Sequence, residues 1–150
     1  MSRPKVHPTI LIVEDGAGTR ELSRLILESN GFTCLSADTI EAALDLIGNT
    51  AKIDVLFSDI HFPGDLSGLD LAQAAVTPPH HIPTLLTSGL AIEYLDEVLP
   101  EGVAFLEKPY SPEALLAAIR SVMAPQNFIA SKWQTAPQPQ QQAIKQMKQL

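Results

Sequence analysis

Charged and hydroxyl side chains follow short apolar runs at four points of this sequence. Glu14 and Asp15 come directly after TILIV, and Asp59 comes directly after DVLFS. Ser88 ends PTLLTS, and Lys108 comes directly after VAFLE. If these runs are parallel strands of one sheet, their carboxyl ends share an edge, where three carboxylates, a hydroxyl and an ammonium converge. Crowded carboxylates repel unless a cation offsets them, and Mg²⁺ prefers carboxylate and phosphate oxygens. The pattern predicts a divalent-cation site, with Lys108 supplying further positive charge.

The elements that would position these side chains alternate along residues 1–124. Apolar runs predict five strands, over 9–13, 32–36, 54–58, 84–87 and 103–107. Helical spacing predicts helices over 19–29, 69–76, 92–99 and 112–123, and one more that Asp38 or Thr39 can cap and that stops at Gly48. Five strand–helix pairs favour a doubly wound α/β fold, a parallel sheet with helices on both faces. The apolar runs at 9–13 and 54–58 are typical of strands buried on both sides.

Composition narrows the class of protein. The chain has 150 residues, of which 45% are hydrophobic and 18% charged, as expected for one globular domain. A formal net charge of −7 argues against direct nucleic-acid binding, which needs clustered Lys and Arg. The single cysteine, Cys34, excludes an intramolecular disulfide and a cysteine-built metal site, and we expect it to be a small core residue. The apolar runs are too short for a membrane span and the first residues lack a signal-peptide pattern, so we expect a cytoplasmic protein.

Residues 125–150 differ from the rest of the chain. Residues 1–124 hold all 17 acidic residues and seven of the ten basic ones, whereas 125–150 hold three lysines, no acid and eight of the nine glutamines. We interpret 1–124 as the domain and 125–150 as a basic, Gln/Pro-rich tail. The tail is either disordered or a short amphipathic helix that docks on the domain, on a second copy or on a partner. It is too short for an output domain, so we expect a stand-alone module.

Four segments resemble the receiver domain of two-component response regulators. They are ILIVED at 10–15, DVLFSDIHFPG at 54–64, PTLLTSG at 83–89 and FLEKPYSPEAL at 105–115, and the resemblance covers about residues 8–124. The loop after Asp59 is longer than in many receivers, a form similar to receivers associated with hybrid histidine kinases. The resemblance implies a flavodoxin-like three-layer sandwich with a five-stranded parallel sheet in the order 2-1-3-4-5.

The resemblance also implies roles for the acidic residues. Asp59 corresponds to the phosphoacceptor, whose carboxylate attacks phosphorus and forms an acyl phosphate. Glu14, Asp15 and Asp59 correspond to the carboxylates that hold Mg²⁺, together with the backbone carbonyl of His61. The metal would neutralise the oxygens of the transferring phosphoryl group.

Three further positions take roles from the same resemblance. Lys108 corresponds to the lysine that pairs with the phosphoryl group, and Pro109 after it is expected to follow a cis peptide bond. Ser88 corresponds to the hydroxyl that donates to a phosphoryl oxygen, and counting from the start of its strand places Thr87 on the other side. Phe105 occupies the aromatic switch position, where it is expected to turn inward when Ser88 moves toward the phosphoryl group.

These roles imply a signalling module of a phosphorelay rather than an enzyme with an external substrate. A histidine kinase or a phosphotransfer protein would supply the phosphoryl group. A downstream protein would contact the face formed by the 92–99 helix, the 103–107 strand and the last helix, and the chain could form a homodimer. The alternative is a constitutive protein-binding module with the receiver fold that is never phosphorylated, although the complete set of site residues argues against it.

Other interpretations of the loops are weaker. The glycines at 16 and 18 begin a dinucleotide-binding fingerprint whose third glycine is missing. A phosphatase of the haloacid dehalogenase type has a second aspartate where this chain has His61, and an imidazole metal ligand there is a less favoured interpretation. His80 and His81 lie in TPPHHIP, which we expect to be an exposed loop rather than a metal site. Leu90 is expected to shield the phosphoryl group from water.

Overall fold

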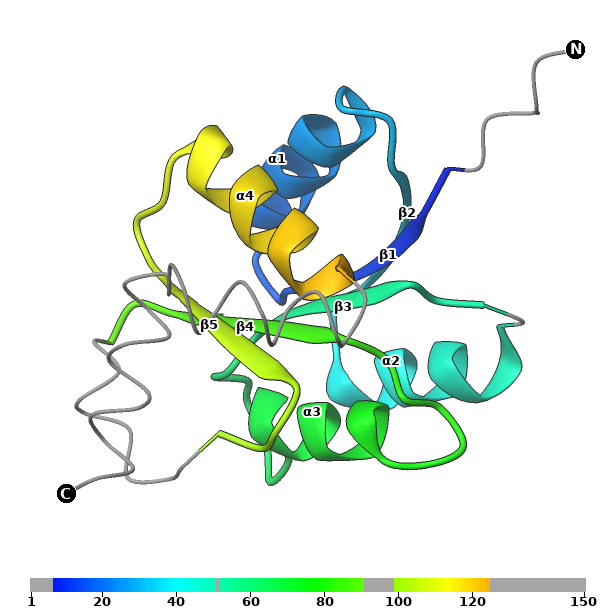
Figure 1. The fold of residues 1–150 in the computed structure, drawn as a ribbon. Helices are drawn as coiled ribbons and strands as arrows, with labels where there is room; N and C mark the ends of the chain where they lie inside the picture. The colour runs from blue at the N-terminus through cyan, green and yellow to red at the C-terminus, as the bar shows by residue number, and fades with distance from the viewer. Residues whose placement is uncertain (1–6, 51, 91–98, 125–150) are drawn as a thin grey trace, which may run out of the picture.

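Five parallel strands form one sheet in the order β2-β1-β3-β4-β5 (Figure 1). The computed structural model describes residues 7–50, 52–90 and 99–124. The strands are β1 (Thr9–Val13), β2 (Thr33–Ala37), β3 (Val55–Asp59), β4 (Thr84–Ser88) and β5 (Val103–Glu107). This order and the parallel pairing confirm the predicted doubly wound α/β fold.

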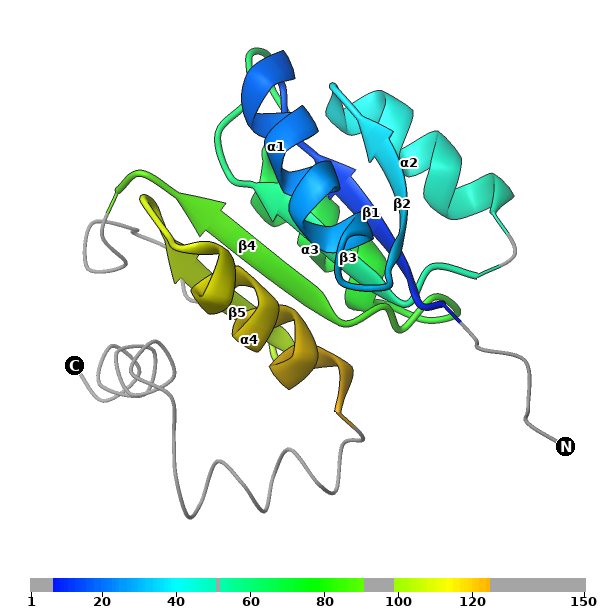
Figure 2. The ribbon, with the colours of Figure 1, turned by 90° about the horizontal axis from the view of Figure 1, so that it is seen from above.

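Helices cover both faces of the sheet, as the alternation of elements predicts. α1 (Ala17–Glu28) and α4 (Pro112–Met123) lie on one face, and α2 (Ile40–Asn49) and α3 (Gly68–Val76) lie on the other (Figures 1 and 2). The predicted helix over 92–99 and the tail over 125–150 lie outside the described residues. No helix within the described ranges has the length and apolar character needed to cross a membrane.

Four helix boundaries differ from the sequence prediction by one or two residues, and those at the start of α1 and the end of α2 are instructive. α1 begins at Ala17 rather than Thr19, after the extended residue Gly16. The first helical residues need no intrahelical partner for their N–H groups, so the small residues there do not delay the start. α2 is capped by Thr39, whose side chain accepts a hydrogen bond from the backbone N–H of Ala42. It then runs through Gly48 to Asn49, because a single glycine weakens a helix without ending it.

The core lies in two layers because successive residues of a strand point to opposite faces. Ile10 and Ile12 of β1 pack with α1 and α4, whereas Leu11 and Val13 pack with α2 and α3. All four are at most 1% exposed. The central strands are therefore apolar at nearly every position, and their polar residues gather at the strand ends.

Cys34 lies on the edge strand β2 and packs against the layer under α1. The side chain is half-buried rather than fully in the core. Burial raises the pKa of its thiol to about 11. The thiolate that would react or bind a metal is therefore disfavoured at neutral pH.

Candidate functional site

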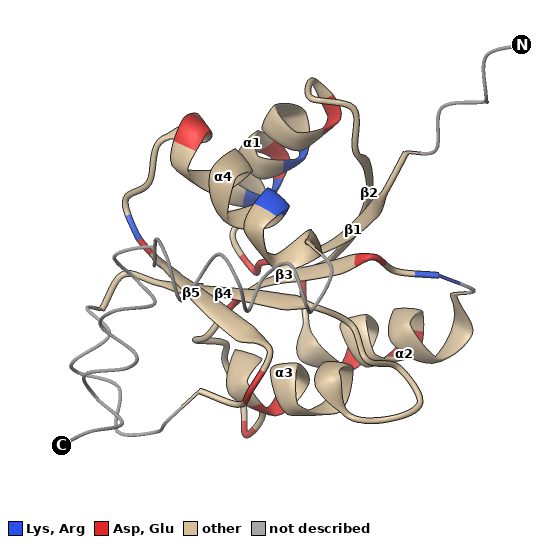
Figure 3. Ribbon diagram, in the orientation of Figure 1, with Lys and Arg blue, Asp and Glu red and all other residues tan. Residues whose placement is uncertain are grey.

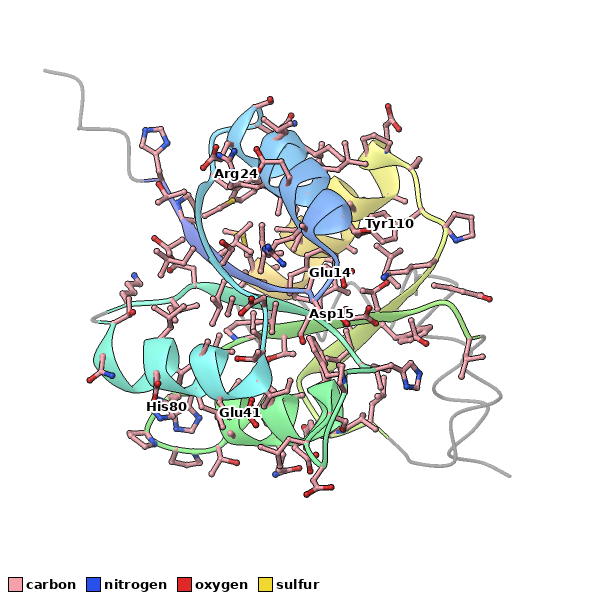
Figure 4. The ribbon with its side chains drawn as sticks, turned by 180° about the vertical axis from the view of Figure 1, so that it is seen from behind. Glu14, Asp15, Arg24, Glu41, His80 and Tyr110 are labelled. Atoms are coloured by element: carbon pink, nitrogen blue, oxygen red, sulfur yellow. The ribbon has the colours of Figure 1, made fainter. Side chains whose placement is uncertain are left out.

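Three carboxylates meet at the carboxyl edge of the sheet. Glu14 and Asp15 follow β1, and Asp59 ends the neighbouring strand β3. One oxygen from each carboxylate lies within 4.8 Å of the others. Glu14 is buried, Asp59 is partly buried and Asp15 is exposed, and Figure 4 shows Glu14 and Asp15 together at the end of β1. The convergence expected from the separate strand ends is thus present for the acids.

Lys108 joins two of these acids from the end of β5. Its Nζ lies 3.1 Å from Oε1 of Glu14 and 3.0 Å from Oδ2 of Asp59. Partial burial alone would lower the pKa of Lys108, but its hydrogen bonds to Asp59 and Glu14 and the charges of both carboxylates outweigh it. The net pKa is raised, so the ammonium is firmly charged at neutral pH.

Glu14 is fixed from four directions. Its backbone N–H donates to the carbonyl of Ala37 at 3.1 Å, and its carbonyl accepts from Nη1 of Arg20 at 2.7 Å. The backbone N–H of Gly16 donates to Oε2 at 3.1 Å, while Lys108 holds Oε1. Arg20 was not among the predicted site residues, because a basic residue in a first helical turn carries no signal that it reaches back to a preceding strand.

The loop after Asp59 is held by a close backbone approach. The backbone N–H of Ile60 donates to Oδ1 of Asp59 at 2.9 Å, and the N–H of Gly68 donates to the carbonyl of Ile60 at 2.7 Å. A Cβ atom on Gly68 would lie 2.0 Å from the carbonyl oxygen of Asp59 and 2.8 Å from Cα of Ile60. Only glycine fits there, so α3 begins directly against the backbone that carries Asp59.

Ser88 and Thr87 face opposite sides at the end of β4. Ser88 is fully buried, and its Oγ accepts from the backbone N–H of Leu90 at 3.0 Å. Thr87 instead donates from Oγ1 to the carbonyl of Leu106 at 2.6 Å. The carbonyl of Ser88 accepts from the backbone N–H of Lys108 at 2.9 Å, which ties the two strand ends together.

Phe105 is only 3% exposed and packs on the α3 side of the sheet with Leu86 and Val103. Register pairs it with Leu86, two residues before Ser88 on the same side of β4. The ring is already inside in this conformation. Its predicted inward turn therefore requires an outward state first, and the switch role stays a prediction.

The remaining predicted positions border the cluster. His61 is exposed two residues after Asp59, and its carbonyl remains a predicted metal ligand. Leu90 is 47% exposed, and its shielding role likewise stays a prediction. The Lys108–Pro109 peptide bond is cis, as expected. Tyr110, for which the sequence suggested no role, packs its ring edge-on against Phe57 and brings its hydroxyl to 3.5 Å from Oγ of Ser23 on α1.

A family model for the response regulator receiver domain matches residues 10–120. The chain belongs to this family. Receiver domains serve phosphorylation-based two-component signalling, and the match spans nearly all of the sheet and every acid of the cluster.

Individual relatives agree with the assignment to the receiver family. A probable transcriptional regulatory protein of Picosynechococcus sp. PCC 7002 is 33% identical over 131 residues, which are 81% of this chain and 51% of that protein. This chain thus spans about half the length of such curated relatives.

Solved structures are also similar. The receiver domain of the hybrid histidine kinase CckA has a TM-score of 0.65 at 29% identity and covers 77% of this chain and 99% of its own. A response regulator receiver protein from Sinorhizobium medicae has a TM-score of 0.71 at 25% identity, over 78% of this chain and 94% of its own.

Proposed function

We propose that this receiver accepts a phosphoryl group on the carboxylate of Asp59, in a Mg²⁺-dependent reaction, and signals through a protein contact that depends on phosphorylation. One observation carries the proposal. The side chain of Asp59 is 13% exposed, its Oδ2 lies 3.0 Å from the ammonium of Lys108, and two further carboxylates lie beside it. A nucleophile that a donor can reach is thus set among groups suited to hold a transferring phosphoryl group.

In the proposed reaction a carboxylate oxygen of Asp59 forms a bond to phosphorus. The bond from phosphorus to the donor, a P–N bond in phosphohistidine or a P–O bond in acetyl phosphate, breaks, and the leaving group keeps the electron pair. Lys108 then faces the phosphoryl oxygens, whose charge it balances, and Ser88 donates its hydroxyl proton to one of them in a hydrogen bond. Both groups come from strands adjacent in the sheet, which favours this arrangement.

The charge of the cluster suits a divalent cation. Lys108 balances one of three carboxylates, so excess negative charge remains in a partly buried pocket. Glu14, Asp15 and Asp59 would hold Mg²⁺ with the backbone carbonyl of His61. When bound, the metal supplies charge neutralisation for the phosphoryl oxygens.

The proposed partners are proteins. A histidine kinase or a phosphotransfer protein would donate the phosphoryl group, and a downstream protein would receive the signal on the face that includes β5 and α4. The proposal includes a cytoplasmic location, no turnover of an external substrate, no direct contact with nucleic acid, and a homodimer as one form that the same face could support.

The test is incubation with acetyl phosphate, with and without Mg²⁺, followed by measurement of the intact mass. We expect a phosphoryl adduct on the wild type with Mg²⁺, and none on Asp59→Asn. Asp54→Asn is the matched control, because Asp54 is an acid at the opposite end of the same strand region and should leave the adduct unchanged.

Two outcomes would contradict the proposal. One is an adduct that persists in Asp59→Asn. The other is a wild type that binds Mg²⁺ but forms no adduct, after rapid hydrolysis has been checked; that result favours a constitutive binding module instead.

A further inference from the structure

An apolar groove lies between α1 and the segment that leads from β5 into α4, beside the phosphoacceptor cluster. Its volume is about 650 Å³. Leu22 and Ile26 of α1 form one wall, and Pro109, Tyr110 and Pro112 form the other. Figures 1 and 2 both place these two helices side by side over the same face of the sheet. Leu22 is 59% exposed here, so the groove presents apolar surface that burial would stabilise.

The groove also extends to the phosphoacceptor cluster at the carboxyl edge of the sheet. Gly89 and Lys108 line its end, and Lys108 is the residue that contacts Glu14 and Asp59. A segment bound in the groove would therefore lie next to the ammonium that the phosphoryl group needs.

We propose that the groove is occupied by residues 128–133 of this same chain. This segment places three large apolar side chains, Phe128, Ile129 and Trp133, within six residues, and covering them would be favourable. The described structure ends at Ala124, directly after α4, whose first residue, Pro112, lines the groove. The segment and the groove are thus both apolar, and the segment follows the helix whose first residue lines the groove.

The connection is long enough for this contact. α4 has 12 residues, so at about 1.5 Å per residue its ends lie roughly 18 Å apart. Trp133 lies nine residue steps beyond Ala124, which span up to about 30 Å when extended, at roughly 3.3 Å per step. Trp133 can therefore reach the end of the groove at Pro112 and Lys108.

Charge adds a longer-range attraction. Residues 125–150 carry three lysines and no acid, whereas residues 1–124 carry 17 acids and seven bases. Acidic residues occur along the helices and loops of the described fold, with fewer basic residues among them (Figure 3). The opposite charges raise the local concentration of the tail at the domain, and the apolar residues then select the groove.

Trp133 is the only tryptophan of the chain, so its fluorescence reports on the tail directly in the intact protein. We expect the native chain to emit at shorter wavelength, and to be less open to acrylamide quenching, than a synthetic peptide of residues 125–150. Leu22→Lys should remove both differences, because it places a positive charge in the apolar groove. That charge has the same sign as Lys108 and as the lysines of the tail. Leu25→Lys is the matched control: Leu25 is 50% exposed on the same helix but does not line the groove, so both differences should remain.

Three results would overturn the contact. The native emission could equal that of the peptide, Leu22→Lys could leave the shift intact in a chain that circular dichroism shows to be folded, or the shift could vanish on dilution, which would indicate docking on a second copy. Labelling by acetyl phosphate is measured separately. If Trp133 is covered but no phosphoryl adduct forms, the tail contact stands and the proposed function fails.

Discussion

The two edges of the sheet both carry charged side chains, but only the carboxyl edge gathers them. There, Glu14, Asp59 and Lys108 come from three strands and meet within hydrogen-bond distance. The amino edge has a cavity of about 450 Å³ lined by residues that include Lys52, Asp54, His80 and His81. Yet Lys52 is 78% exposed and lies 3.5 Å from Asp54. Within the described ranges, the only acid or histidine cluster able to hold a metal is the one at the carboxyl edge.

The difference teaches that a cavity and charged residues do not by themselves make a site. At the carboxyl edge Glu14 and Asp59 are partly or fully buried and share an opposite charge from another strand, so their positions are fixed. At the amino edge His80 and His81 are neighbours in one exposed loop, and both side chains face water. The two edges contain similar residue types. They differ because the acids of the carboxyl edge are buried together with an oppositely charged partner.

The largest expected effect compares the two lysines. Lys108→Ala removes the ammonium from the cluster, so we expect labelling by acetyl phosphate to slow by about 100-fold or more. Lys52→Ala, at the other edge, should label at the wild-type rate. Time courses of intact mass measure both rates, and equal rates in the two variants would contradict the contrast between the edges.

The next contrast compares two glycines. In Gly68→Ala the new methyl group meets the backbone of Asp59 and Ile60, so we expect a loss of about 2–3 kcal/mol in the free energy of unfolding. Gly48→Ala, where a Cβ meets nothing within 4 Å, should instead gain up to about 1 kcal/mol. Urea denaturation measures both. If Gly68→Ala were as stable as the wild type, the backbone of Asp59 and Ile60 would have to shift at little cost to make room for the methyl group.

A smaller effect is expected at the amino edge itself. Oδ2 of Asp54 accepts a hydrogen bond from the backbone N–H of Thr9 at 2.7 Å. Asp54→Ala removes that acceptor and should cost about 1–2 kcal/mol of unfolding free energy. Lys52→Ala breaks only an exposed ion pair and should change it by less than about 0.5 kcal/mol. If the two variants lost equal stability, the Lys52–Asp54 ion pair, rather than the hydrogen bond from Thr9, would account for the stabilisation by Asp54.

The smallest expected effect is on pH dependence. The raised pKa of Lys108 means that its ion pairs stabilise the fold fully below the ordinary lysine value of 10.5, and that this stabilisation is lost as pH rises through the folded value. The wild type should therefore lose stability more steeply than Lys108→Met above pH 10.5. Urea denaturation over that range tests this, and parallel curves would mean that Lys108 does not contribute.

Much of this molecule could be predicted because its local signals agree with the fold. Buried strands such as β1 are apolar along nearly their whole length, and the order of strands and helices alone places the residues after them at a common edge. The contacts of Arg20 and Gly68 could not be found in that way. Each depends on how a helix approaches the end of a strand, which is set by three-dimensional packing and leaves no periodic signal in the sequence.

The pair formed by Lys108 and Glu14 spans 94 residues of chain, and the pair with Asp59 spans 49. During synthesis the acids emerge first, and β5 with its lysine emerges only after four strands have been made. A partly synthesised chain therefore carries the three acids without the lysine that pairs with two of them, and closing such distant contacts is slow. The phosphoacceptor pocket can be completed only when nearly all of the domain has left the ribosome. A chain that is still being synthesised therefore lacks a complete pocket.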